Sequence, residues 1–313
     1  MFKRIIFLSL LISLTNSCAQ KNLKKQMETI TKTVFQQTPK HDKQPMYALQ
    51  VDKKGCRASI WVNDWNVDNY WNKGGYTVTE TISPYIIKSG KQTITMKIYP
   101  REGVKYIDDL TYVSLELIYV PQKGCDMNQY QLLQTIKLPE EIKDKKLPYF
   151  EMTIPFEAKV PWDHSLFYED LQDLRKIPNI EIKLLEEYKK YVLMIENNDQ
   201  ENYIEKMFKN RKYEFETLYI KEKEVKEYMD SDIKDVSPLK NKEVQFLDTN
   251  YEIVYEVNGR VAHLISKLDK EAIIRVIYGD IITQGEHKGK KQSEISTGAK
   301  LILPKGKTEF ENL

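Results

Sequence analysis

A histidine and several carboxylates lie close together in the middle of the sequence, where their types suit acid–base chemistry. His164 is followed by Glu169 and Asp173, and a histidine with nearby carboxylates can bind a metal ion or transfer protons. The alternative is that Asp163 caps a helix whose first turn favours acidic side chains. The other histidines lack metal-ligand spacing and the chain lacks nucleophile and cofactor motifs, so we expect no metal and no cofactor.

Aromatic side chains gather in a second segment, where their rings could bind a ligand. Three of the four tryptophans, Trp61, Trp65 and Trp71, lie here together with Tyr70. In a strand over residues 57–63 the small and aliphatic side chains face the core, so Trp61 faces outward. An outward tryptophan with aromatic neighbours can support a sugar ring or anchor a protein partner. Two alternatives remain open: Trp61 packs under the helical domain, or a β-bulge turns it inward.

Cys18 ends a leader that has a basic start and an apolar run over residues 5–14, which is the anatomy of a secretory signal. The segment Thr15-Asn16-Ser17-Cys18 resembles a bacterial lipobox. That resemblance implies that Cys18 is lipidated and becomes the mature N-terminus. The alternative is cleavage after Ala19, which would give a secreted or soluble periplasmic protein.

The other two cysteines, Cys56 and Cys125, are expected to pair. An exported protein folds in an oxidising compartment, so we predict a disulfide between them. Each follows Lys-Gly, which indicates a strand that starts after a turn. The alternative is two unpaired, buried thiols.

The leader also predicts where in the cell the protein is located. Residues 1–17 are the predicted signal peptide, and residues 18–44 form a basic tether that connects the lipid anchor in the membrane to the body. A short amphipathic helix is possible within the tether, because four apolar residues have helical spacing. These are Leu23, Met27, Ile30 and Val34. We expect a protein anchored to a bacterial cell envelope, facing the periplasm or exposed on the surface. The near-neutral body has no basic surface for nucleic acid.

Residues 45–160 have the two-residue alternation of half-buried antiparallel strands. The alternation is clearest over residues 92–99, 113–119 and 150–160, and glycine turns separate the segments. Roughly seven or eight such strands predict a β-sandwich. The stretch 82–99, an extended approach and a glycine turn before a core strand, resembles a step common in immunoglobulin-like and jelly-roll sandwiches. The resemblance implies a fold and no function.

The pattern changes after Pro161. Residues 161–240 are predicted to be mainly helical, with helices over 162–177 and from 180 to about 228. Residues 241–313 return to alternation, and Asn258-Gly259 is a strong hairpin signal. Helices followed by a four-stranded antiparallel sheet form an α+β domain. The predicted fold is therefore an all-β antiparallel sandwich followed by an α+β domain, 161–313.

These observations favour a non-catalytic envelope lipoprotein that recognises a protein or glycan partner in an accessory, adhesion or immunity-type role. The predicted binding residues are Trp61, Trp65, Tyr70 and Trp71. The alternative is an envelope hydrolase with an acid–base or metal site near His164.

Overall fold

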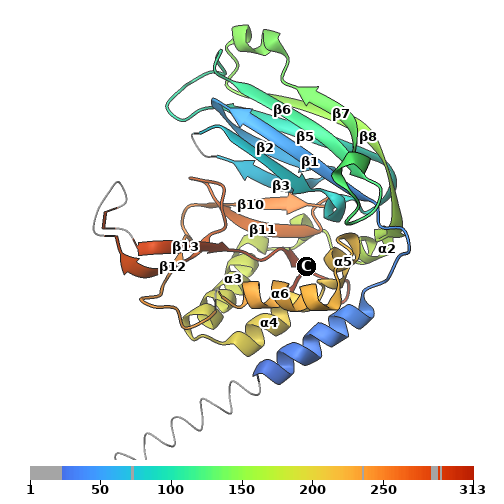
Figure 1. Cartoon of the computed structure of the whole chain (residues 1–313). Helices are drawn as coiled ribbons and strands as arrows, with labels where there is room; N and C mark the ends of the chain where they lie inside the picture. The colour runs from blue at the N-terminus through green and yellow to red at the C-terminus, as the bar shows by residue number, and fades with distance from the viewer. Residues whose placement is uncertain (1–22, 72–73, 235, 283–287, 290) are drawn as a thin grey trace, which may run out of the picture.

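The structure has two parts packed on each other, a β-sandwich and a mixed α/β body (Figure 1). The computed structural model describes residues 23–71, 74–234, 236–282, 288–289 and 291–313. The predicted signal peptide and Cys18 lie outside the described residues. The predicted fold class, an antiparallel sandwich followed by an α+β region, is confirmed.

Two four-stranded antiparallel sheets form the sandwich. The order of one is β4 (Tyr76–Thr81), β1 (Met46–Lys54), β6 (Tyr112–Val120) and β7 (Gln131–Lys137). The order of the other is β3 (Trp65–Tyr70), β2 (Cys56–Val62), β5 (Lys88–Pro100) and β8 (Phe150–Asp163). Three short 3₁₀ helices lie in the connections between these strands: η1 (Ser83–Tyr85), η2 (Met127–Gln129) and η3 (Glu140–Lys145). Alternate residues such as Ile94 and Met96 of β5 and Leu115 of β6 are completely buried in one core, as the two-residue period predicts.

Strand β8 crosses the predicted domain boundary at residue 160. Its last residue, Asp163, pairs with Lys88 of β5, so the chain stays extended where a helix over 162–177 was expected. That prediction is wrong because strand pairing satisfies the backbone polar groups here. A five-residue helix, α2 (Ser165–Glu169), and a 3₁₀ turn, η4 (Leu174–Lys176), follow.

The second part combines helices with two small antiparallel sheets. Its helices are α3 (Ile180–Glu196), α4 (Gln200–Phe208), α5 (Lys212–Thr217) and α6 (Glu222–Asp232). One sheet has the order β10 (Tyr251–Glu256), β11 (Val261–Ser266), β14 (Leu301–Ile302) and β15 (Glu311–Asn312). The other has the order β13 (Lys291–Thr297), β12 (Ile274–Ile281) and β9 (Glu243–Phe246). The single four-stranded sheet predicted here is therefore two sheets, while the β10–β11 hairpin turns at Asn258-Gly259 as expected.

The predicted tether contains a docked helix over residues 23–37. Val34 is buried in the core of the second part, and three other residues of the predicted helical stripe pack against the same core. These are Leu23, Met27 and Ile30. From residue 23 onward, this segment is therefore part of the folded body, as Figure 1 shows for the blue helix at the bottom.

The predicted disulfide is absent, since Cys56 and Cys125 are both free thiols. Cys56 starts β2, and its Sγ lies 3.9 Å from the carbonyl oxygen of Tyr112, at the first residue of β6. Cys125 comes after the last residue of β6, Val120, in a turn and not at the start of a strand. The length of β6, about 27 Å at 3.4 Å per residue, therefore separates the two turns. A disulfide requires Cα atoms within about 7 Å, so the prediction is wrong for this fold.

Candidate functional site

A cleft of about 310 Å³ lies between the outer face of the β3-β2-β5 sheet and the β10–β11 hairpin. The sandwich contributes Ser59, Trp61, Asn66, Asn69, Trp71, Lys97 and Tyr99. The hairpin and the turn after it contribute Glu252, Val254, Ile265 and Lys270. Two of the four predicted binding residues, Trp61 and Trp71, are thus brought together here.

Strand β2 places Trp61 in the cleft through its alternation. Ala58, Ile60 and Val62 are completely buried in the sandwich core. Trp61, on the opposite face, is half-buried and lines the cleft, as the strand pattern predicts. The wall opposite is the β10–β11 hairpin, so Trp61 faces strands of the second part of the molecule across an open space and does not pack under its helices.

A β-bulge in β3 completes this face of the sheet. Ser59 pairs with Asn69 and Trp61 pairs with Asn66, so Val67 is an extra residue on the β3 side. The bulge changes the alternation within β3, and both asparagines reach the cleft. Tyr70, next in the chain, turns into the sandwich core. The bulge lies on β3 and not on β2, so it does not turn Trp61 inward.

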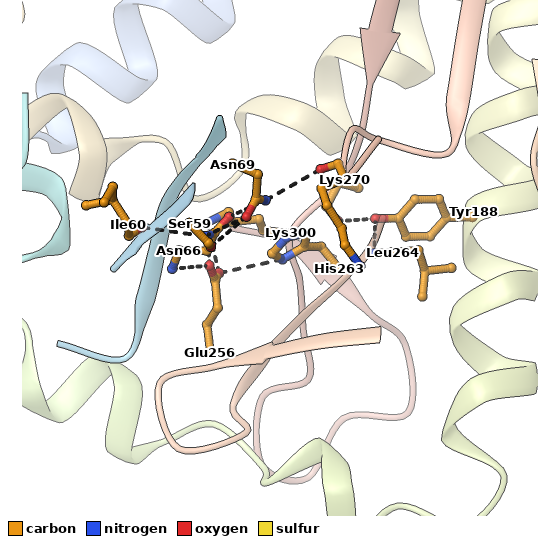
Figure 2. A network of polar contacts seen from close by, with 11 residues as sticks. Ser59, Ile60, Asn66, Asn69, Tyr188, Glu256, His263, Leu264, Lys270 and Lys300 are labelled. Carbon is orange, nitrogen blue, oxygen red and sulfur yellow. Dashed lines mark hydrogen bonds and ion pairs between the residues drawn. The ribbon is translucent and has the colours of Figure 1, made fainter. Parts of the chain in front are cut away.

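Ser59, Asn66 and Asn69 form a hydrogen-bonded floor of the cleft (Figure 2). The Ser59 hydroxyl donates to Asn69 Oδ1 at 2.7 Å and accepts from Trp61 Nε1 at 2.9 Å and Asn66 Nδ2 at 3.1 Å. Asn69 Nδ2 donates to Asn66 Oδ1 at 2.9 Å. These bonds fix the orientation of two amides and one hydroxyl, so the polar groups are arranged before a ligand arrives.

Aromatic rings and cations surround this floor. The rings of Trp71 and Tyr99 are 5.1 Å apart. Lys97 Nζ lies 4.2 Å from the centre of the Trp61 ring, and Arg57 Cζ lies 5.2 Å from that of Trp71. Such distances allow cation–π attraction, which holds the charged groups beside the rings. The cleft therefore combines apolar faces, amides, a hydroxyl and positive charge.

Trp65 and Tyr70, the other two predicted binding residues, are buried elsewhere. Trp65 packs between the two parts of the molecule, with its ring 5.7 Å from that of Tyr168. Tyr70 belongs to the sandwich core and contacts Tyr76. Neither side chain lines the cleft, because Trp65 and Tyr70 pair with Val62 and Ala58, two residues of β2 that face away from the cleft.

A buried ionic contact holds the hairpin against the sandwich. Glu256 of β10 is completely buried; it accepts from the backbone N–H of Asn66 at 2.9 Å, and Lys300 Nζ lies 2.8 Å from its Oε2 (Figure 2). His263 Nδ1 lies 3.7 Å from the same carboxylate. Burial lowers the pKa of His263 to about 4, although Glu256 opposes this, so the imidazole is neutral at pH 7. Asn66 therefore connects the cleft floor to the interface.

His164, Glu169 and Asp173, the predicted catalytic candidates, do not converge. Asp173 pairs with Arg175 at 2.8 Å, and these hydrogen bonds lower its pKa to about 2. Glu169 is exposed and borders a different depression from the one that His164 lines. The predicted cluster is therefore not one site. Asp163 is not the expected helix cap, since His164 occupies the N-cap of α2; its Oδ1 accepts from the backbone N–H of Ser165 at 2.9 Å in the turn before the helix.

The actual partner of His164 is Glu216 of α5, far away in the sequence. His164 Nε2 lies 2.9 Å from Glu216 Oε2, and His41 Nε2 lies 2.7 Å from Glu216 Oε1. Burial alone would raise the pKa of Glu216, but its hydrogen bonds to both histidines outweigh burial and lower it. His164 also lines a pocket of about 280 Å³ between the two parts. No serine, threonine or cysteine is among the described residues that line that pocket.

The chain matches no protein-family model, no curated protein and no solved structure. Within the ranges that the structure describes, no three or more His, Cys, Asp or Glu side chains are grouped so that they could hold a metal ion. A helix long and apolar enough to cross a membrane is not found in those ranges either. Function must therefore be argued from the geometry of the site.

Proposed function

We propose that this protein is a non-catalytic envelope protein that binds a glycan in the cleft of Trp61, Trp71 and Tyr99. The observation that carries the proposal is the combination of three half-buried rings with an ordered floor of hydroxyl and amide groups. A sugar ring presents apolar C–H faces, which pack on aromatic rings, and hydroxyls, which exchange hydrogen bonds with amides.

The dimensions of the cleft favour a glycan over a protein partner. A cleft of about 310 Å³ is within the range that small ligands occupy. A stable protein interface buries about 800 Å² on each partner and is built around fully desolvated anchors. Trp61 and Trp71 lie instead inside a narrow space with polar groups on the floor, which suits one or a few sugar rings.

The test uses the purified full-length chain in detergent, with a glycan array followed by calorimetry on the best oligosaccharide. Removing an aromatic anchor costs about 2 kcal/mol of binding, so Trp61→Ala and Trp71→Ala should each weaken binding about 30-fold. Tyr130→Ala is the matched control, because Tyr130 is an exposed aromatic residue outside the cleft. The melting temperature should change little in all three variants.

Two outcomes would contradict the proposal. Binding that survives both tryptophan substitutions would place the glycan site elsewhere. If no glycan binds and a cross-linked protein partner is lost in Trp61→Ala, the cleft is a protein-binding site.

Lipid anchoring at Cys18 is the second part of the proposal. It is supported by the basic start, the apolar run and the lipobox-like Thr15-Asn16-Ser17-Cys18 segment. Replacing Cys18 with Ala should move the protein from the membrane fraction to the soluble fraction. An unchanged distribution would contradict lipidation at this residue.

A second candidate function is acid–base catalysis in the pocket that His164 lines, by an envelope hydrolase. The observation that favours it is the Glu216 carboxylate behind the imidazole, since such a carboxylate orients a histidine and stabilises its protonated form. Hydrolysis of a panel of ester and glycoside substrates that is abolished in both His164→Gln and Glu216→Gln would support this function. Activity that is absent, or unchanged in both variants, would contradict it.

A further inference from the structure

We infer that the glycan held in the cleft is an acidic one, whose carboxylate pairs with Lys97 and Arg57. This inference rests on the proposed glycan-binding function. It names the chemical class of the ligand, a saccharide that contains uronic acid residues. The observation behind it is that Lys97 and Arg57 lie beside the aromatic rings and have no counter-charge from the protein itself.

The cations around the cleft outnumber the carboxylates. Arg57, Lys97 and Lys270 approach the rings of Trp61 and Trp71. Lys270 has a partner, Glu252, at 2.8 Å. Lys97 and Arg57 have no carboxylate within ion-pair distance among the described residues.

A carboxylate that could have neutralised Lys97 is engaged elsewhere. Glu151 of β8 is directly opposite Lys97 in the strand register, which is the usual position for an ion pair. Glu151 instead accepts a hydrogen bond from the Tyr149 hydroxyl, and no ion pair with Lys97 forms. Glu151 is exposed, so its charge is screened by solvent. The ammonium of Lys97 is left against the ring of Trp61.

The two cations are also positioned to act together. Arg57 pairs with Tyr99 and Lys97 pairs with Ser59 across neighbouring strands, so the two side chains are diagonal neighbours on the outer face of the sheet. Diagonal neighbours in an antiparallel pair are about 7–8 Å apart, within reach of both long side chains. Arg57 uses Nε to donate to the carbonyl of Pro100 at 2.8 Å, which fixes the guanidinium and leaves its terminal nitrogens for a ligand.

A carboxylate is the group that this arrangement suits. The fork of a guanidinium matches the two oxygens of a carboxylate, and charge-assisted bonds of this kind are about twice as strong as neutral ones. A sugar ring stacked near Tyr99 would place an acidic substituent between Arg57 and Lys97. A neutral sugar would leave both cations without a counter-charge.

The experiment compares each acidic oligosaccharide with its own methyl ester, which keeps the rings and removes the charge. Oligogalacturonates, oligomannuronates and their methyl esters are titrated into the full-length chain by calorimetry. We expect the acids to bind at least tenfold more tightly than the esters, with a preference that shrinks as NaCl is raised. Lys97→Met and Arg57→Met should each reduce binding of the acid while binding of the ester changes little. Lys159→Met, an exposed lysine on β8 outside the cleft, is the control.

The outcomes separate this inference from the proposed function. Equal binding of acids and esters that is lost in Trp71→Ala would overturn the inference and leave the glycan site intact. A preference for acids that persists in both Lys97→Met and Arg57→Met would overturn the assignment to these residues. Absence of binding to every acidic and neutral saccharide would overturn the proposed function, and the inference with it.

Discussion

The stability of this protein should fall on mild acidification because of one buried histidine at the domain interface. The side chain of His263 in β11 is 13% exposed and lies 3.7 Å from the buried carboxylate of Glu256. Its folded pKa is about 4, against 6.5 for an ordinary histidine. Between these two values the unfolded chain binds a proton that the folded chain does not, so lowering the pH favours unfolding.

The magnitude follows from the two pKa values. Integrating the difference in proton binding from pH 7.5 to pH 5.0 gives a loss of about 2 kcal/mol in the free energy of unfolding. The matched variant is His263→Leu, which keeps an apolar side chain in the same place and has no proton to bind. The loss of stability between the two pH values should be about 2 kcal/mol smaller in the variant than in the parent.

The assay is urea denaturation followed by tryptophan fluorescence at pH 7.5 and pH 5.0. The other titrating groups are present in both proteins, so their effects cancel in the difference. His263→Gln is a second variant in case leucine disturbs the packing. If the parent and both variants lose the same stability on acidification, then His263 is not held neutral by burial and the reasoning fails.

Two other features of the structure give predictions of their own. Glu216→Gln should destabilise the chain by about 2 kcal/mol at pH 7.5, because it weakens two hydrogen bonds to a buried charge. Since the folded pKa of Glu216 is lowered, this difference should shrink as the pH falls below 4.5, and a difference unchanged by pH would contradict the assignment. Non-reducing peptide mapping should find Cys56 and Cys125 unlinked. In the native state, thiol labelling should be slow at Cys56, whose pKa burial raises to about 11; a linked pair would contradict the fold.

The sandwich could be predicted from the sequence because each strand is recognisable from the alternation of its own neighbouring residues. Alternation over residues 92–99 and 113–119 identifies strands whose inner residues are buried in the structure. The pairing of the cysteines could not be predicted in this way. Cys56 and Cys125 both follow a Lys-Gly turn, but strand direction places those turns at opposite ends of β6, and direction is a property of the topology.

In the segment after Pro161, long-range contacts prevent the helix that the local sequence pattern predicts. The segment after Pro161 has the composition of a helix, yet Trp162 donates to the carbonyl oxygen of Ile86 and Asp163 pairs with Lys88. The pairing with Lys88 extends β8 to Asp163, and the indole Nε1 of Trp162 makes the bond to Ile86. The partner of His164 was missed for the same reason: Glu216 is 52 residues away in the chain, and nothing in the spacing of the sequence connects them.

The orientation of Trp61 in the cleft could be predicted from the sequence. The positions of the β3 residues beside it depend on one inserted residue. The two-residue alternation of β2 is enough to predict from the sequence that Trp61 faces outward, as it does. Val67, the extra residue of the bulge, then brings Asn66 and Asn69 to the same face and sends Tyr70 into the core. The Asp and Asn residues at alternate positions in this segment show only that a turn or an irregularity is favoured. The register that brings the two asparagines to the cleft floor is set by the pairing of β3 with β2.

Asn66 shows why the cleft and the domain interface should be considered together. Its side chain donates to Ser59 in the floor, while its backbone N–H donates to Glu256 of the hairpin on the opposite wall. The same carboxylate is neutralised by Lys300, and removing one partner from a buried pair is costly because the other charge remains buried. The two walls are therefore held at a fixed separation by a contact that neither part can make alone. A cleft built in this way needs both parts of the molecule, since the sandwich supplies the rings and the hairpin encloses the space above them.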